Sequence, residues 1–398
     1  MQTVILAAGE GTRMRPLTAT RPKPMLPIGD RPLVAHTADA AVKAGASTLV
    51  LVVGYEGDQL RAYFGDEYAG VPVEYAVQER QRGTADAVRA AREALDDAPF
   101  VVLNGDDIYD ADSLAELYDA APAVGAHEVE DPRPYGVFDV TNGTVKTVVE
   151  KPEDPPSNRV NVGAYAFPAK AQEWLDVSES ERGEREITDV LARVVAEREV
   201  RAVDVSFWLG VGRPWELLAA NEWFLDGIDR RIEGDVDPAA ELRGPVVVEE
   251  GATVDAGVVV EGPALIRSDA TIGPNAYVRA KTVIGDGATI GHGVEVKNSV
   301  LMTGATAGHL SYVGDSVLGR EVNFGAGTVV ANLRHDDGTV RLRVKGEMTD
   351  TGRRKFGVVV GDGAKTGINT SLNAGVKLGA DARTGPGETV TRDIDTEY

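Results

Sequence analysis

Short apolar runs alternate with longer amphipathic stretches over the first half of the chain. The runs "TVILAAG", "STLVLVVGY" and "FVVLNGDD" have the length and the aliphatic composition of buried strands. Between them lie "PLVAHTADAAVKAGA" and "GTADAVRAAREALDD", which read as helical stretches. This alternation predicts an α/β domain with a mostly parallel sheet over residues 1–228.

The hydrophobic period changes in the second half of the chain. Aliphatic residues recur at every sixth position without a slip, at Val248, Val254, Val260, Ile266, Ile272, Val278, Ile284, Ile290 and Val296. The same step returns at Leu318, Phe324 and Val330, and again between Val360 and Val390. A period of six fits neither a helix nor a lone strand, and predicts a parallel β-helix of hexapeptide repeats over residues 246–398. The polar residues 229–245 would then form a linker.

Composition narrows the class of protein. The 398 residues suggest two domains, and 63 acidic against 41 basic residues give a net charge of −22. Only 11 of the basic residues are lysines, and this acidic, lysine-poor composition leads us to expect a salt-loaded cytoplasm. Cysteine is absent, so we expect no disulfide, thiolate nucleophile or cysteine-bound zinc. The sequence shows no basic stripe for nucleic acid, no apolar run of the ~20 residues that cross a bilayer, and no signal peptide before its first strand. We therefore expect a cytoplasmic enzyme.

Candidate chemistry begins directly after the first apolar run, in "GEGTRMRPLTATRPKPMLP". Glycines after a strand let backbone N–H groups approach a phosphate closely. The four prolines at 16, 22, 24 and 27 forbid a helix and carry Lys23 on a stiff, extended chain, in the same stretch as Arg13. Neither a dinucleotide fingerprint nor a Walker loop fits, because the third glycine and the GK[ST] ending are both missing. Taken alone, the stretch is equally compatible with a glycine loop that carries surface cations.

This stretch closely resembles the signature of the sugar-1-phosphate nucleotidylyltransferases, which implies a Rossmann-like domain. In that family a phosphate oxygen of a sugar-1-phosphate attacks the α-phosphate of UTP or dTTP, and pyrophosphate leaves. By this resemblance Arg13 clamps the triphosphate, Lys23 contacts the reacting phosphates, and Asp106 in "LNGDD" holds Mg²⁺. The implied nucleotide-binding residues are Leu6, Ala8, Gly9, Gly11, Thr12, Gln78, Gly83 and Thr84, and those for the sugar phosphate are Gly136, Glu150 and Asn161.

The sequence departs from this family at the second metal ligand. Gly210 and Gly212 stand in "WLGVGRPW", where relatives usually carry Asp or Asn. Mg²⁺ commonly binds few protein ligands, so we favour a coordination shell made of Asp106, nucleotide phosphates and water. Alternatively, Asp107 or Asp204 contributes to metal binding, or the nucleotidyl-transfer activity is weakened.

The six-residue step breaks at "LMTGATAGHLSYVGDSVLG", which resembles the acetyltransferase half of the bifunctional GlmU-type enzymes, in their archaeal, here haloarchaeal, branch. An amine that attacks acetyl-CoA needs a base titrating near neutral pH, and His309 is the candidate. The resemblance implies amino-sugar-phosphate contacts from Arg279, Lys297, Tyr312, Asn323 and Asn332, and acetyl-CoA contact from Ala326. It also implies a left-handed β-helix and a homotrimer. In the loop 333–357, Gly338 and Arg341 replace lysines typical of the archaeal branch, which leaves the amino-sugar preference open.

Three functions are compatible with these patterns. The first is a bifunctional enzyme that acetylates glucosamine-1-phosphate and couples N-acetylglucosamine-1-phosphate or glucose-1-phosphate to a nucleotide. The second is a glucose-1-phosphate uridylyl- or thymidylyltransferase whose β-helix serves only as a trimer scaffold. The third is a silent nucleotide-sugar sensor or regulatory subunit. The segment "GHLSYVGD" and Asn332 favour the first, because a scaffold does not require them.

Overall fold

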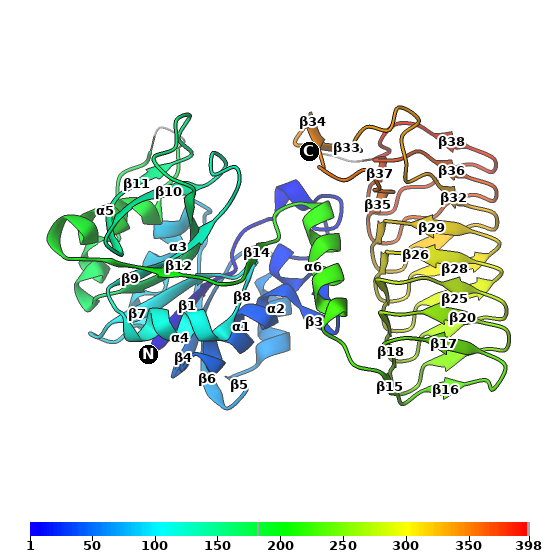
Figure 1. Cartoon of the computed structure of the whole chain (residues 1–398), viewed down its shortest axis with the longest axis horizontal. Helices are drawn as coiled ribbons and strands as arrows, with labels where there is room; N and C mark the ends of the chain where they lie inside the picture. Colours follow the sequence, from blue (N-terminus) through cyan, green and yellow to red (C-terminus); the bar gives the residue numbers. More distant parts are fainter. Residues whose placement is uncertain (181–182, 396–398) are drawn as a thin grey trace. The chain divides into compact units, whose positions relative to one another are not determined.

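The computed structural model describes residues 1–180 and 183–395, which form two compact units (Figure 1). The first unit comprises Met1–Glu10, Arg21–Leu26 and Arg31–Gly210. The second comprises Gly11–Thr20, Pro27–Asp30 and the chain from Val211 onward. The glycine- and proline-rich stretch near the N-terminus is therefore shared between the two units.

A ten-stranded sheet is the frame of the first unit, with strand order β10-β11-β13-β9-β12-β7-β1-β4-β6-β5. Its strands are β1 (Gln2–Leu6), β4 (Thr48–Val53), β5 (Glu67–Tyr68), β6 (Val71–Val77), β7 (Phe100–Asn104), β9 (Ala123–Glu128), β10 (Gly136–Thr141), β11 (Thr144–Glu150), β12 (Arg159–Phe167) and β13 (Arg201–Asp204). Short strands β3 (Arg31–Pro32), β8 (Asp107–Tyr109) and β14 (Trp208–Gly210) lie outside it. β7, β1, β4 and β6 are parallel, as expected, whereas β12 pairs antiparallel with β7 and β9. Asn142-Gly143, both at positive φ, closes the β10–β11 hairpin, and such a tight turn requires antiparallel strands.

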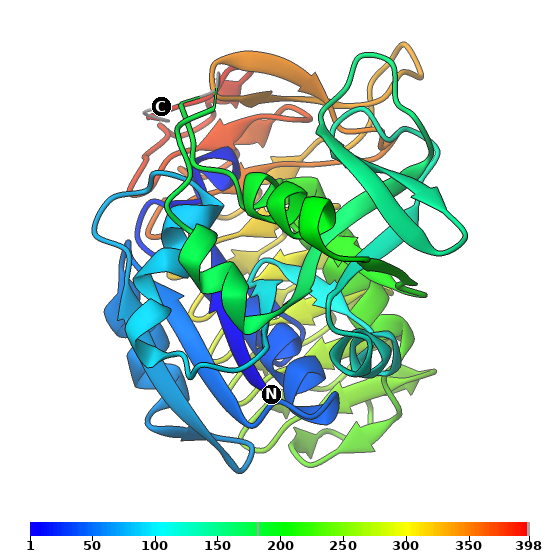
Figure 2. The same cartoon turned by 90° about the vertical axis from the view of Figure 1, so that its left-hand side faces the viewer.

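Helices cover both faces of this sheet, which Figure 2 shows from a second side. One core packs α1 (Leu33–Lys43), α2 (Gly57–Phe64) and α4 (Ala111–Asp119) against the sheet, and the other packs α3 (Thr84–Ala90) and α5 (Ile187–Glu197). The 3-10 turns are η2 (Lys23–Met25), η3 (Arg92–Ala94) and η4 (Ala169–Trp174). Val50 belongs to one core and its neighbour Leu51 to the other, because successive side chains of a strand point to opposite faces. Burial on both faces accounts for the continuous apolar runs of the sequence.

The second unit is a parallel β-helix, as the six-residue step predicted. Its strands stack into three parallel sheets. The first holds β15 (Arg231–Ile232), β18 (Val246–Val248), β21 (Ala264–Ile266), β24 (Thr282–Ile284), β27 (Val300–Leu301), β30 (Val317–Leu318), β35 (Val359–Val360) and β37 (Lys377–Leu378). The second holds β16 (Asp235–Val236), β19 (Thr253–Val254), β22 (Thr271–Ile272), β25 (Thr289–His292), β28 (Thr306–His309) and β31 (Asn323–Phe324). The third holds β17 (Glu241–Arg243), β20 (Val259–Glu261), β23 (Tyr277–Val278), β26 (Glu295–Lys297), β29 (Tyr312–Gly314), β32 (Val329–Val330), β36 (Ser371–Leu372) and β38 (Thr389–Val390).

The residues of the six-residue step form the core of this β-helix. All nine aliphatic residues from Val248 to Val296 lie in one buried cluster. The first coil begins earlier than expected, because β15, β16 and β17 fall inside the segment 229–245 that read as a linker. Val236 and Leu242 extend the step backward from Val248, but the charged residues around them conceal it. An end coil has a neighbour on one side only, which explains why it carries so many polar residues.

One long insertion interrupts the coils. It leaves the β-helix after β32 and returns at β35, and it contains the antiparallel hairpin β33 (Arg341–Val344) and β34 (Glu347–Asp350). The other elements of the second unit are η1 (Thr12–Met14), β2 (Pro27–Ile28) and α6 (Pro214–Asp226). In the part of the chain that the structure describes, no helix has the length and hydropathy needed to span a membrane.

Candidate functional site

The first group of candidate residues lies at the carboxyl edge of the parallel strands in the first unit. Leu6 ends β1 opposite Val52 of β4 and Asn104 of β7, so the loops that follow these strands share one edge. A Cβ at Gly54 would lie 2.8 Å from the Ala8 carbonyl oxygen, and therefore only glycine fits there. The structure thus brings Leu6 and Ala8 to the edge where ligands of open α/β sheets bind.

Lys23 and Asp106 form an ion pair at this edge. Pro22 is extended and leads into η2, which places the Lys23 side chain in a buried position, while Asp106 follows β7 and stays partly exposed. The residues expected to contact the reacting phosphates and to hold Mg²⁺ are therefore direct neighbours. A partly exposed carboxylate beside a fixed cation suits a site where metal and phosphate charges must be balanced.

Asp107 is the carboxylate closest to Gly210, one of the two glycines that stand where relatives usually carry the second metal ligand. It pairs in register with Gly210, and a Cβ at Gly210 would lie 3.0 Å from its Oδ1. Burial, and then the charge of Asp106, raise the pKa of Asp107 to about 8, although Asn104 donates a 3.0 Å hydrogen bond to its Oδ2. Asp204 on β13 instead lies 3.4 Å from the guanidinium of Arg159 on β12.

These carboxylates fit a magnesium ion that has few protein ligands. Among the residues that the structure describes, no three His, Cys, Asp or Glu side chains cluster as a metal cage. Mg²⁺ commonly takes one or two carboxylates and completes its shell with phosphate and water oxygens. The partly exposed Asp106 carboxylate, with Asp107 next in sequence, meets that requirement.

The expected base-reading residues are brought together between β6 and α3. Gln78 is buried, and its Nε2 donates to the Gly83 carbonyl and to Asp86, both at 3.1 Å. Gly83 has φ +113, and a Cβ there would collide with the Arg185 carbonyl. The Thr84 hydroxyl accepts a 2.9 Å bond from the Ile187 N–H. Asp86, which the sequence analysis missed, fixes the Gln78 amide.

The expected sugar-side residues meet on three adjacent strands. Gly136 pairs with Glu150, and a Cβ at Gly136 would lie 2.9 Å from the Glu150 carboxylate and 3.4 Å from Asn161. Asn161 donates a 2.7 Å bond to the Tyr165 hydroxyl, and its Oδ1 accepts one from the Gly163 N–H at 3.0 Å. Tyr165 was not singled out from the sequence, because a buried aromatic in a strand reads as core.

The remaining nucleotide-binding candidates are divided by the unit boundary. Gly9 belongs to the first unit, whereas Gly11, Thr12 and Arg13 belong to the second. Gly11 has φ +63 and caps η1, which contains Thr12 and Arg13. The Arg13 guanidinium is exposed and lies 3.3 Å from a Cβ built at Gly212. The second glycine of "WLGVGRPW" therefore leaves room for Arg13.

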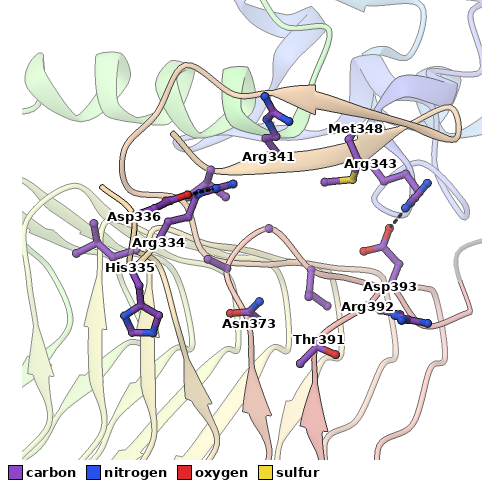
Figure 3. Close-up of a pocket in the computed structure, with 15 residues that line it drawn as sticks. Arg334, His335, Asp336, Arg341, Arg343, Met348, Asn373, Thr391, Arg392 and Asp393 are labelled. Atoms are coloured by element: carbon purple, nitrogen blue, oxygen red, sulfur yellow. Dashed lines mark hydrogen bonds and ion pairs between the residues drawn. The ribbon is translucent and has the colours of Figure 1, made fainter. Parts of the chain in front are cut away.

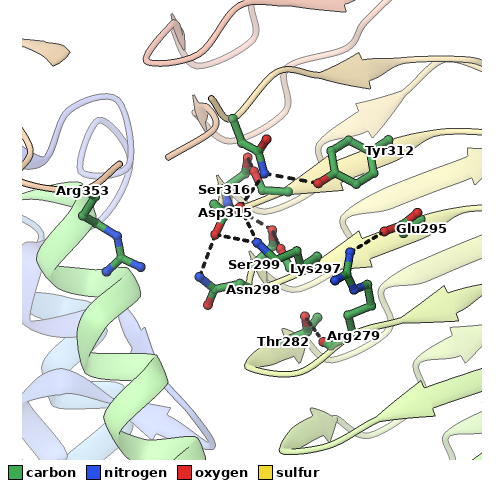
Figure 4. A network of polar contacts seen from close by, with 12 residues as sticks. Arg279, Thr282, Glu295, Lys297, Asn298, Ser299, Tyr312, Asp315, Ser316 and Arg353 are labelled. Atoms are coloured by element: carbon green, nitrogen blue, oxygen red, sulfur yellow. Dashed lines mark hydrogen bonds and ion pairs between the residues drawn. The ribbon is translucent and has the colours of Figure 1, made fainter. Parts of the chain in front are cut away.

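A polar network lies on the third sheet of the β-helix (Figure 4). Asp315 is 2% exposed and accepts from Lys297 at 3.0 Å, from Asn298 at 2.9 Å and from Asn332 at 2.5 Å. The Asn332 amide also donates to the Tyr312 hydroxyl at 3.2 Å. Two predicted acceptor-site residues, Lys297 and Asn332, therefore share one buried carboxylate, which the sequence analysis did not identify.

Arg279 lies one coil before Lys297, at the end of the neighbouring strand of the same sheet. Its guanidinium pairs with Glu295 at 3.0 Å on the exposed face of the sheet. The stacked strands β23, β26, β29 and β32 therefore present two cations, a hydroxyl and an amide along one side. Such a row can hold a phosphate and the hydroxyls of a sugar.

His309 lies elsewhere, on the second sheet. It ends β28 in register with His292 of β25, and its ring is exposed. Asn323 is on the adjoining strand β31, and the Ala326 carbonyl accepts a 2.7 Å bond from Asn369. Within the described part of the chain, no hydrogen bond or ion pair joins His309, Asn323 or Ala326 to the polar network. One chain therefore presents its predicted acetyl-transfer residues in two groups.

Comparison with known proteins agrees with this division into two halves. A family model described as "Nucleotidyl transferase" matches residues 2–227, and one described as "GMPPB C-terminal domain" matches residues 260–376. Among solved structures, UDP-glucose pyrophosphorylase complexed with UDP-glucose is similar with a TM-score of 0.53 and 27% identity. That match covers 56% of this chain and 98% of the solved chain.

Relatives that match the whole chain come from archaea. The bifunctional protein GlmU of Methanocaldococcus jannaschii is 40% identical over 400 residues, covering 100% of this chain and 96% of that protein. The bifunctional sugar-1-phosphate nucleotidylyltransferase/acetyltransferase of Sulfurisphaera tokodaii is 36% identical, covering 99% of this chain and 98% of that protein. This chain is therefore an enzyme, and it belongs to the nucleotidyl transferases and, over its whole length, to the bifunctional GlmU family.

Proposed function

We propose that the first unit, with the Arg13 segment, transfers a uridylyl or thymidylyl group to a sugar-1-phosphate. A phosphate oxygen of N-acetylglucosamine-1-phosphate or glucose-1-phosphate attacks the α-phosphate of the nucleoside triphosphate. The bond to the β-phosphate breaks, and pyrophosphate leaves. The observation that carries this proposal is the Lys23–Asp106 pair at the carboxyl edge of the sheet.

The chain's own residues position the charges for this reaction. Lys23 neutralises the phosphate at which the new bond forms, and Arg13 holds the leaving phosphates. Gln78, with Asp86 fixing its amide, presents hydrogen-bonding groups to a pyrimidine, and Glu150 and Asn161 face the sugar. Mg²⁺ held by Asp106 would supply charge neutralisation to the phosphate oxygens.

The β-helix, in the same proposal, acetylates the amine of glucosamine-1-phosphate. His309 accepts a proton as the amine attacks the thioester carbonyl of acetyl-CoA, and the carbon–sulfur bond breaks to release CoA thiolate, which takes up a proton. Arg279 and Lys297 hold the sugar phosphate, and Tyr312 with Asn332 contacts the sugar. Because these residues form two groups in one chain, we propose a homotrimer in which neighbouring copies complete each site.

The network around Asp315 argues against a purely structural β-helix. A scaffold gains nothing from burying a carboxylate with a lysine and two asparagines, since buried polar groups cost free energy unless fully paired. A monofunctional nucleotidylyltransferase on a trimeric scaffold is therefore the weaker candidate. The cytoplasmic location and the adaptation to high salt belong to the same proposal.

The experiment measures both products from one enzyme preparation. CoA release from acetyl-CoA is followed with glucosamine-1-phosphate or galactosamine-1-phosphate, and pyrophosphate release with UTP or dTTP, each at molar and at low salt. His309→Ala should lose CoA release and keep pyrophosphate release, and Lys23→Ala should do the reverse. If neither amino sugar releases CoA while pyrophosphate release is normal, the acetyl-transfer proposal is wrong.

A further inference from the structure

A cavity of about 920 Å³ lies in the second unit, under the inserted hairpin (Figure 3). Its walls come from the start of the insertion, from β33 and β34, and from the turns that follow β36 and β38. A cavity of this volume is within the range that holds a molecule of nucleotide size. Of the residues considered above for either reaction, Arg341 lines it.

The walls of this cavity carry excess positive charge. Four arginines line it against two aspartates, in a chain whose net charge is −22. Arg334 is paired with Asp336 at 2.8 Å, and Arg343 lies 4.0 Å from Asp393. The other two arginines at the cavity have a different environment.

Arg341 and Arg392 have no carboxylate within ion-pair distance, although Arg341, after the hydrogen bonds from Thr339 and the Gly352 N–H, helps to lower the pKa of Asp350 on the facing strand. Within residues 1–180 and 183–395, no hydrogen bond or ion pair engages either guanidinium, and both are exposed. An acidic protein has many carboxylates available, so two guanidiniums left unpaired in one concave site indicate an anionic ligand. Guanidiniums bind phosphate with two parallel hydrogen bonds, so a phosphate group suits this position.

Apolar side chains complete the cavity. Leu333 is 40% exposed and Met348 is 53% exposed, and both line the same space. An inorganic ion would leave these side chains in water, whereas an organic phosphate would cover them. The combination of unpaired arginines and exposed apolar side chains therefore selects a ligand that has both phosphate groups and a flat or apolar part.

The cavity continues the row of acceptor-site residues. Leu333 follows Asn332 directly, and Val330, Leu372 and Val390 pair in register on β32, β36 and β38. The turns after these strands stack along the same side of the β-helix as Arg279 and Lys297, at about 4.8 Å per coil. A ligand in the cavity would thus lie within a few coils of the acceptor network.

We propose that this cavity binds a nucleoside diphosphate group, with the phosphates on Arg341 and Arg392 and the base against Leu333 and Met348. Two molecules connected with the proposed function carry this group, and the inference rests on that function for their identity. One is CoA, the acyl donor. The other is the nucleotide sugar, which as a product could bind there and regulate acetyl transfer.

The test compares Arg341→Gln/Arg392→Gln with a control of equal charge, Lys345→Gln/Arg193→Gln. Lys345 is in the turn of the same hairpin and Arg193 is on α5, and both are exposed and outside the cavity. Calorimetric titrations use CoA and, separately, UDP-N-acetylglucosamine, with the full chain at moderate salt. We expect one of the two ligands to bind the arginine variant at least about tenfold more weakly, and the control variant to bind like the original protein.

The ligand whose binding weakens in the arginine variant identifies the molecule that occupies the cavity. Weaker CoA binding assigns the cavity to the acyl donor, and loss of one of two UDP-N-acetylglucosamine sites assigns it to the nucleotide sugar. If both ligands bind the arginine variant normally, the proposal is overturned. Titration does not need turnover, so a failure of acetyl transfer is distinguishable from a failure of this proposal.

A kinetic measurement separates binding at the cavity from general damage. If CoA is the ligand, the single variant Arg392→Gln should have a raised KM for acetyl-CoA and an unchanged rate with acetyl-pantetheine, which lacks the nucleotide. Equal loss with both donors would contradict binding of CoA through its nucleotide. Pyrophosphate release by the first unit serves as the folding control.

Discussion

Replacing Asp315 by Asn tests whether the polar network on the β-helix is held by one buried charge. The substitution keeps the size of the side chain, and it suits the backbone, because Asp315 has φ +51 and Asn tolerates that conformation well. It removes the negative charge that Lys297, Asn298 and Asn332 share. Lys297 would then be an unpaired cation in a largely buried position.

The structure also supplies a matched exposed pair. Asp315 and Lys297 have side chains that are 2% and 19% exposed, and removing one partner of a buried ion pair costs about 3–5 kcal/mol. Arg279 and Glu295 are 39% and 37% exposed, and such surface pairs contribute at most about 1 kcal/mol. Asn retains one oxygen acceptor, so we expect Asp315→Asn to cost about 3 kcal/mol, and Glu295→Gln to cost below about 1 kcal/mol.

The assay must report on the β-helix itself. All four tryptophans precede residue 224, so their fluorescence is unsuitable, and urea unfolding should be followed by far-ultraviolet circular dichroism. The KM for glucosamine-1-phosphate should also rise in Asp315→Asn, because Lys297 is no longer held in place. Equal losses of stability in the two variants would refute the reasoning, since burial would then not decide the effect.

Three further predictions concern other parts of the chain. Gly163→Ala should cost more than about 1 kcal/mol in thermal unfolding, because Gly163 has φ +72 and a Cβ would strike the Asn104 amide; an unchanged melting temperature would contradict this. Burial lowers the pKa of Lys377 to about 8 from 10.5, so only the unfolded chain keeps this proton between those pH values, and stability should rise with pH there. Lys377→Met should abolish this rise, which amounts to at most about 3 kcal/mol, and parallel stability–pH curves would count against it. Chelation of Mg²⁺ should stop pyrophosphate release and leave CoA release unaffected, and loss of both would indicate a shared requirement.

The fold was predictable where a pattern repeats. The six-residue step located the coils from Val248 onward, because each inward residue must be apolar to fill the core. The first coil was not predicted, because Val236 and Leu242 stand among charged residues that cover the end of the β-helix. The antiparallel half of the sheet was not predicted, because strands such as β10 and β11 mix polar and apolar residues and lack the continuous apolar runs of the buried parallel strands.

The candidate sites were predictable as sets of residues but not as contacts. Lys23 and Asp106 are separated by 83 positions, and nothing local indicates that they form an ion pair. Asp315 follows a glycine in a turn, where a carboxylate normally faces water, and only the stacking of coils shows that it is buried. Pairings of this kind depend on strand register, which the periodicity of a single sequence does not specify.

The insertion before β35 has a consequence for how such enzymes can change. Although it separates Leu318 from Val360 by some forty positions, these two residues pair in register on adjacent parallel strands, as equivalent residues of uninterrupted coils do. The ladder therefore closes beneath the insertion, and the hairpin with its cavity is a detachable module on an unbroken scaffold. Exchanging that module among relatives should alter which molecules are recognised without disturbing the coils above or below it, so substrate choice and stability can evolve separately.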